Sequence, residues 1–194
     1  MAKLEIEMIP VHCHYSNVRS ALPKKEWDRI RKLSYKNAKY KCEICGDTGK
    51  NQGKYHAVEC HEIWNYDYEK KIQKLDGLIS LCPNCHLVKH FGRANALNLE
   101  DKAFEHLKKV NEWTDEEVIE HLAESYKILK KRNKHIWKLN LKVLIEDYGV
   151  KRKLVTEGEN KSRDVEPPWK KKWLKKKKNA RGKTKMKVRP KKKK

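Results

Sequence analysis

Two short stretches decide the fold: CEIC at residues 42–45 and CPNCHLVKH at residues 82–90. Each contains a Cys-x-x-Cys pair, and thiolates spaced in this way in a turn can converge on one Zn²⁺ ion. We therefore predict a structural zinc site with four ligands. The alternative, free buried cysteines, requires two accidental pairs in a chain with only six Cys. The predicted ligands are Cys42, Cys45, Cys82 and Cys85.

Histidines and acids gather inside and just after these two motifs. The segment VECHEIW carries Glu59, His61 and Glu62, and the segment CHLVKH carries His86 and His90. Because residues four apart lie on the same face of a helix, the imidazoles of His86 and His90 can share one ion. Single histidines are usually ordinary surface or core residues, but here a helical pair, an acid-rich cluster and two cysteine knuckles coincide. We therefore predict a second metal site.

The spacing of apolar residues predicts an α+β chain. Thr114 and Glu117 form a capping box at the start of one helix. The apolar run from Trp137 fits both strand and helix periods, and we favour a helix from Asn140, whereas residues 1–22 show no clear period. The predicted helices cover residues 24–39, 83–92, 99–112 and 114–131, and a strand or hairpin arm covers residues 55–66.

Positive charge is concentrated at one end of the chain. The 194 residues carry 48 Lys plus Arg against 26 Asp plus Glu, a formal net charge of +22. Residues 169–194 hold 16 of the basic residues and no acid, which leaves a net of only +6 before them. We expect this Lys-rich tail to be disordered until it meets a polyanion; the alternative is a solubilising or localisation tail. The residues expected to bind nucleic acid are Lys170, Lys171, Lys172, Trp173, Lys175, Lys176, Lys177 and Lys178.

The composition also limits the class of protein. Hydrophobic residues make up 38% of the chain and the mean hydropathy is −1.00, so part of the chain carries no core. The sequence contains neither a run of about 18 apolar residues nor the order of a signal peptide, so we expect a cytoplasmic protein without a membrane partner. We expect five segments: an arm and helix (1–40), a metal-binding module (41–92), a helical extension (93–149), a linker (150–168) and the tail (169–194).

The order CEIC, VECHEIW and LISLCPNCHLVKH resembles the HNH endonucleases, or ββα-metal nucleases, in the subgroup that carries a four-cysteine zinc. The resemblance covers about residues 40–92. It implies a zinc-stapled ββα-metal module surrounded by helices, in which a hairpin presents the first motif histidine and the next helix supplies further ligands. Carried over to this chain, His61, His86 and His90 would hold a catalytic cation such as Mg²⁺, Mn²⁺, Ni²⁺ or Zn²⁺.

The sequence departs from this family at the general base. Family members commonly read Asp-His-Ile or His-His-Ile where this chain reads His61, Glu62 and Ile63. In the register we prefer, Ile63 matches the family isoleucine, His61 binds the metal and Glu62 takes the proton from water. In the other register His61 is the base, and Cys60 or Glu59 stands near the metal. The middle asparagine of the family has no counterpart at its usual position.

The resemblance therefore implies an endonuclease that hydrolyses DNA phosphodiester bonds, with His61 and Glu62 as its catalytic residues. The Lys-rich tail would add affinity that does not depend on base sequence. DNA is the preferred partner over RNA, and no residue identifies a protein partner. The alternative is a noncatalytic DNA- or RNA-binding protein on a degenerate HNH scaffold.

Overall fold

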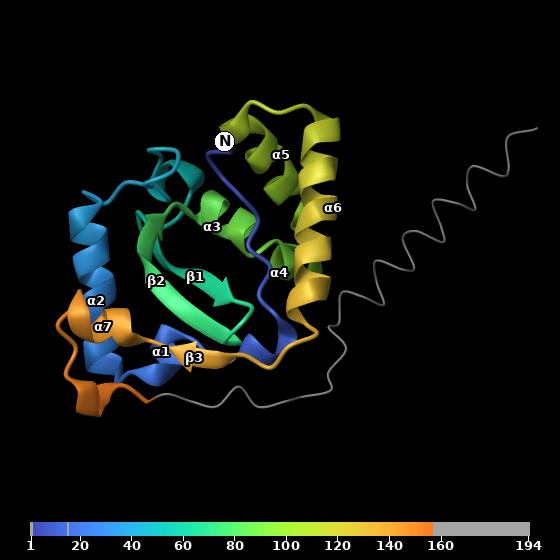
Figure 1. Ribbon diagram of the computed structural model, residues 1–194. Coiled ribbons are helices and arrows are strands. Elements are labelled where there is room, and N and C mark those ends of the chain that lie inside the picture. The colour runs from blue at the N-terminus through green and yellow to red at the C-terminus, as the bar shows by residue number, and fades with distance from the viewer. Residues whose placement is uncertain (1, 15, 157–194) are drawn as a thin grey trace, which may run out of the picture. The chain divides into compact units, whose positions relative to one another are not determined.

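A long antiparallel hairpin lies at the centre of the computed structural model, which describes residues 2–14 and 16–156 (Figure 1). Strand β1 (Glu59–Asp67) pairs with β2 (Ile72–Leu81), and the short β3 (Lys138–Asn140) adds to β2 in parallel. Asp76 is the extra residue of a bulge in β2, since Ile63 pairs with Gly77 and the next residue, Trp64, pairs with Leu75. Strand β1 is therefore regular, and its side chains alternate between the two faces of the sheet.

Helices cover both faces of the hairpin. Helix α3 (Pro83–Lys89) lies against one face, whereas α2 (Lys24–Asn37) and α7 (Lys142–Glu146) lie against the other, on the opposite side of the hairpin in Figure 1. The second face carries a core cluster in which Ile30, Leu75 and Leu144 are each fully buried. Burial of these apolar side chains fixes which residues of β1 face α2 and which face α3.

Local sequence signals account for several helix boundaries. Cys82 is the N-cap of α3 and Pro83 its first residue, where the missing N–H of proline costs no hydrogen bond. Helix α6 (Asp115–Arg132) begins with the predicted capping box: the N–H of Glu117 donates to Thr114 Oγ1 at 3.3 Å, and the N–H of Thr114 donates to Glu117 Oε2 at 2.7 Å. The helix predicted at 24–39 is α2, and that predicted at 99–112 is α5 (Glu100–Asn111).

Elsewhere the structure refines the expectations. The apolar run from Trp137 forms both alternatives in succession, β3 and then α7, and Trp137 itself is buried. The helix predicted at 83–92 ends at Lys89, and a separate helix α4 (Phe91–Ala96) follows. The remaining elements are α1 (Val18–Ala21) and the short 3-10 helices at Val11–Cys13, Lys50–Gln52 and Arg152–Leu154.

The described residues, 2–14 and 16–156, belong to one compact unit. Most of the predicted linker and the whole Lys-rich tail, with its expected nucleic-acid-binding residues, lie outside the described residues. Over residues 2–14 and 16–156, no helix combines the length and the apolar character that crossing a bilayer requires.

Candidate metal centres

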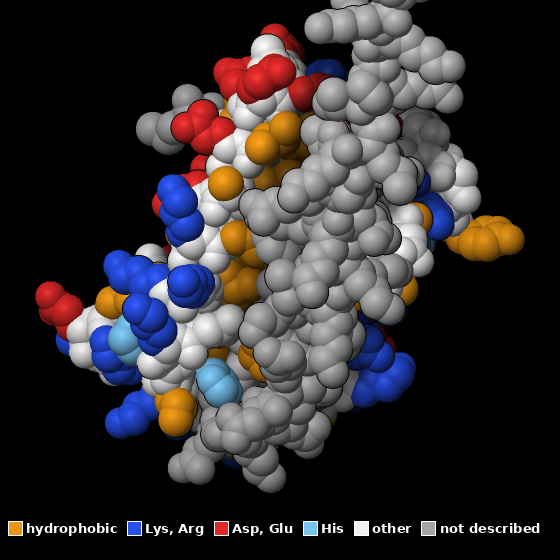
Figure 2. Space-filling view, turned by 90° about the vertical axis from the view of Figure 1, so that its right-hand side faces the viewer, with side chains coloured by type: hydrophobic (Ala, Val, Ile, Leu, Met, Phe, Trp, Pro, Cys, Tyr) orange, Lys and Arg blue, Asp and Glu red, His pale blue; other side chains and the backbone are white. Residues whose placement is uncertain are grey.

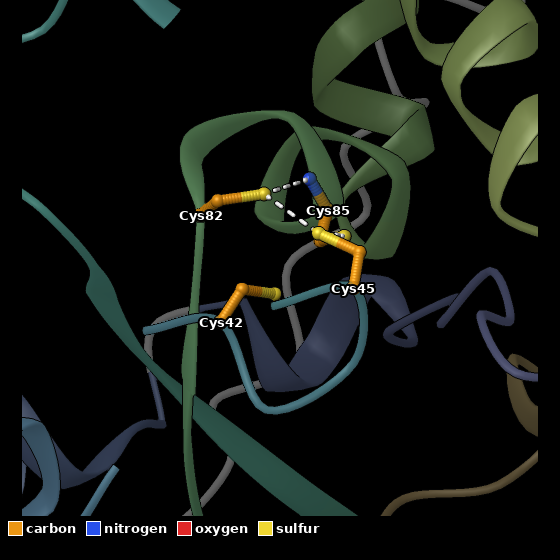
Figure 3. A group of neighbouring side chains, drawn as sticks. All are labelled: Cys42, Cys45, Cys82 and Cys85. Carbon is orange, nitrogen blue, oxygen red and sulfur yellow. Dashed lines mark hydrogen bonds between the residues drawn. The ribbon is translucent and has the colours of Figure 1, made fainter. Parts of the chain in front are cut away.

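The four cysteines of the two knuckles converge on one point (Figure 3). Cys42 and Cys45 lie on the loop after α2, Cys82 follows the end of β2, and Cys85 lies in the first turn of α3. The loop closes tightly because the N–H of Gly46 donates to the carbonyl of Cys42 at 2.8 Å, and Gly46 has a φ of 74°, which favours glycine. The predicted set of four is thus brought together as a group that could hold a metal ion such as zinc.

The spacing of the sulfur atoms suits a zinc ion. The Sγ of Cys45 lies 3.6 Å from that of Cys82 and 3.5 Å from that of Cys85. These separations are far longer than a disulfide bond of about 2.05 Å. In a regular tetrahedron with Zn–S bonds of about 2.3 Å, neighbouring sulfur atoms are about 3.8 Å apart. Hydrogen bonds among the four thiols lower the pKa of Cys42 and raise that of Cys45.

His106 contacts the cysteine group from a helix outside the two motifs. Its Nε2 lies 3.1 Å from Cys85 Sγ, and it reaches this position because α5 packs against α3. An N–H that donates to a thiolate offsets part of the negative charge that four cysteinates place around one Zn²⁺. No spacing signal in the sequence marks His106, because the contact depends on the packing of α5 and α3.

Three histidines form a second group on the face of the sheet that α3 covers. The ligand atoms of His61, His86 and His90 all lie within 4.8 Å of one another, and the ring centroids are 4.6 to 5.2 Å apart. His61 comes from β1, His86 from α3, and His90 is the residue that ends α3. The predicted histidine set is therefore brought together from the hairpin and the following helix.

Two carboxylates lie behind these histidines. Glu7 Oε2 accepts from His61 Nε2 at 3.0 Å, and Glu7 Oε1 accepts from Lys89 Nζ at 2.8 Å. Glu59 Oε2 accepts from His86 Nδ1. Neither glutamate belongs to the convergent group of ligand atoms. Each therefore holds the proton of one ring nitrogen and leaves the other nitrogen of its histidine free for a metal, as carboxylates do behind many metal-binding histidines.

Burial and charge set the protonation states of this group. Burial lowers the pKa of His90 to about 3, so the ring is neutral, the form that binds metal. Burial alone would raise the pKa of Glu7, but the hydrogen bond with His61 and the charge of Lys89 lower it to about 2. The hydrogen bond with His86 likewise lowers the pKa of Glu59 to about 2. Both glutamates are thus anionic acceptors near neutral pH.

Glu62 lies outside the convergent histidine group. As the neighbour of His61 on a regular strand, it lies on the opposite face of the hairpin. There Glu62 Oε1 accepts from the N–H of Val18 at 2.7 Å, at the start of α1, and burial raises the pKa of Glu62 to about 7. This contact joins α1 to β1.

Sequence reasoning missed Glu7 and His106 altogether. Glu7 lies in the N-terminal arm, which has no clear apolar period, and the N–H of Glu7 donates to the carbonyl of Lys89 at 3.1 Å. This contact joins residues far apart in the chain and has no local signal. Comparisons with protein-family models, with curated proteins and with solved structures find no match for this chain.

Proposed function

We propose that this protein is a metal-dependent endonuclease of the HNH type that hydrolyses phosphodiester bonds in DNA. The observation that carries the proposal is the convergence of His61, His86 and His90 from a hairpin and its following helix. Beside them four cysteines have the sulfur spacing of a zinc site. This combination supports the zinc-stapled ββα arrangement that the motifs imply.

Each group of residues has a distinct role in the proposed reaction. The four cysteines hold a structural zinc ion that fixes the junction of β2 and α3, and so the position of His86 and His90. The histidines hold a divalent cation, which when bound supplies Lewis acidity at a phosphoryl oxygen and lowers the pKa of water. Glu7 keeps the proton of His61 on Nε2 and leaves Nδ1 for the cation, whereas Glu59 keeps the proton of His86 on Nδ1 and leaves Nε2.

His61 itself is a second candidate for the general base, since Glu62 lies outside the histidine group. A histidine that is oriented by a carboxylate can act as a general base toward water. In this variant of the mechanism Glu7 orients His61, while His86 and His90 hold the cation with Glu59 beside them. The two variants differ in whether His61 contributes to metal affinity.

A noncatalytic nucleic-acid-binding protein on the same scaffold is the second candidate function. The position of Glu62 favours it, because the residue expected to take the proton from water accepts from the N–H of Val18 and lies outside the histidine group. The middle asparagine of the HNH motif is also missing. Under this alternative the histidines would hold a metal only to stabilise the hairpin and α3.

The test is cleavage of supercoiled plasmid DNA by the zinc-loaded protein in Mg²⁺, Mn²⁺, Ni²⁺ or Zn²⁺. We expect nicked or linear product from the wild type, none from His90→Ala, and wild-type rates from His14→Ala, because His14 is exposed and outside the histidine group. Metal titration of His61→Ala separates the two roles: loss of affinity makes His61 a ligand, and retained affinity without cleavage makes it the base. Intact DNA with every metal would overturn the proposal in favour of the binding protein.

A further inference from the structure

Three segments that each carry a lysine meet at Tyr68. Tyr68 lies just after β1, in the turn of the hairpin. Lys131, in the last turn of α6, has its Nζ 4.3 Å from the centre of the Tyr68 ring. Lys71 donates from Nζ to the carbonyl of Tyr68, and the N–H of Lys138 donates to the carbonyl of Lys71 at 2.8 Å. The hairpin turn, the end of α6 and the start of β3 therefore meet here.

His135 also lies close to Tyr68, and the nearby lysines affect its pKa. Its ring lies 6.0 Å from that of Tyr68, in edge-to-face contact. Burial, followed by the charges of Lys71, Lys134 and Lys131, lowers the pKa of His135. We define the Tyr68 patch as Tyr68, Lys71, Lys131, Lys134 and Lys138. Two acids, Asp67 and Glu69, flank Tyr68 in the chain, and the four lysines of the patch outnumber them.

The lysines of the Tyr68 patch have no carboxylate partners within the described part of the chain. None of them takes part in a salt bridge there, although Lys127 on the same helix pairs with Glu124 at 2.9 Å. Three of them, Lys131, Lys134 and Lys138, are exposed. Figure 2 shows Lys and Arg side chains gathered in the lower left part of this face, while most of the Asp and Glu side chains in view lie near its top. Helix α6 has acids in its first turn and Lys and Arg in its last.

We propose that the Tyr68 patch binds the phosphate backbone of a DNA duplex about seven base pairs from the phosphate that is cleaved. The inference rests on the proposed endonuclease function and deepens it. Unpaired lysines on an exposed surface gain affinity for DNA by releasing its condensed counterions. His61 and Tyr68 are seven residues apart on extended chain, a distance of about 23 Å. Because DNA rises about 3.4 Å per base pair, about seven base pairs of duplex cover this distance.

The patch is tested with full-length protein in which Lys131, Lys134 and Lys138 are replaced by Gln. The matched control replaces Lys25, Lys32 and Lys36 of α2 by Gln; these lysines are also exposed and form no salt bridge with a described residue, so the two variants have equal net charge. Duplex DNA binding is measured between about 50 and 200 mM salt, in buffer without added divalent cation. The Lys-rich tail is present in both variants, so the difference between them reports the patch.

We expect the patch variant to bind duplex DNA more weakly, with a slope of log affinity against log salt reduced by about 1 for each lysine that contacts phosphate. The control should bind as the wild type does. Equal affinities and slopes for the two variants would overturn the inference, as would a loss confined to structured RNA or to polyglutamate, a stand-in for an acidic protein. Because no cleavage is needed, weaker DNA binding by the patch variant would support the patch even if the wild type cut nothing.

Discussion

Neighbouring side chains on β1 have opposite surroundings. His61 faces α3 and the other two histidines, while Glu62 faces α1 and accepts from the N–H of Val18. The period-two alternation of a strand is enough to predict that the two residues point apart. The resemblance to the HNH motif gives no sign of this, because it assigns metal binding to His61 and proton abstraction to the next residue, Glu62. Glu7, the carboxylate that does reach His61, could not be found in the sequence because its contact spans 54 residues.

Replacement of Glu62 should affect stability rather than metal binding. Glu62→Ala leaves the buried N–H of Val18 without its acceptor, and we expect a decrease of about 1 to 3 kcal/mol in the free energy of unfolding. Glu62→Gln keeps an oxygen in place and should destabilise the fold much less. Urea unfolding followed by circular dichroism measures both. A stable Glu62→Gln protein that binds metal normally but cannot cleave DNA would return Glu62 to a catalytic role.

Replacement of Glu7 should weaken the histidine site. Glu7→Gln removes the anionic acceptor from His61, and removal of such a carboxylate behind a metal ligand typically lowers metal affinity by about 10- to 100-fold. Calorimetric titration of Co²⁺ into the zinc-loaded protein measures this affinity. Glu5→Gln is the matched control, because Glu5 is exposed two residues earlier in the same arm. Equal affinities in the two variants would show that Glu7 does not support the site.

Among the helices and strands, those with local signals could be predicted and those fixed by distant contacts could not. The capping box of α6 and the proline start of α3 are encoded within four residues, and both are found. In contrast, β3 exists only because residues 138–140 pair with the start of β2. The convergence of the two knuckles was predictable from spacing and ligand chemistry, whereas the approach of α5, which brings His106 to Cys85, was not.

The cysteine group should stabilise the junction between β2 and α3. Cys45→Ala removes one of the four ligands, so we expect the bound zinc to dissociate and the midpoint of thermal unfolding to fall by several degrees. Cys60→Ala is the control, because Cys60 lies outside the group and burial raises its pKa to about 12. Metal analysis and calorimetry give both quantities. Full zinc content in Cys45→Ala would contradict the four-cysteine site.

At the scale of the whole molecule, positive charge is concentrated in two places. The Lys-rich tail carries most of the excess, and the Tyr68 patch adds a local cluster on the folded part. Removal of residues 169–194 should lower duplex affinity and reduce the salt slope by about 0.9 for each phosphate that the tail neutralises. Filter binding across a salt series measures this slope. A slope equal to that of the full chain would exclude binding of the tail to DNA phosphates.

The decisive measurement combines metal occupancy and cleavage in the same samples. Mn²⁺ or Co²⁺ is titrated into zinc-loaded protein, and bound metal and plasmid nicking are recorded at each step. We expect one zinc to remain bound and nicking to rise in proportion to a second equivalent, with neither the second equivalent nor nicking in His86→Ala. Nicking that is independent of the second equivalent, or no nicking when His61, His86 and His90 are fully occupied, would contradict hydrolysis at the histidine site.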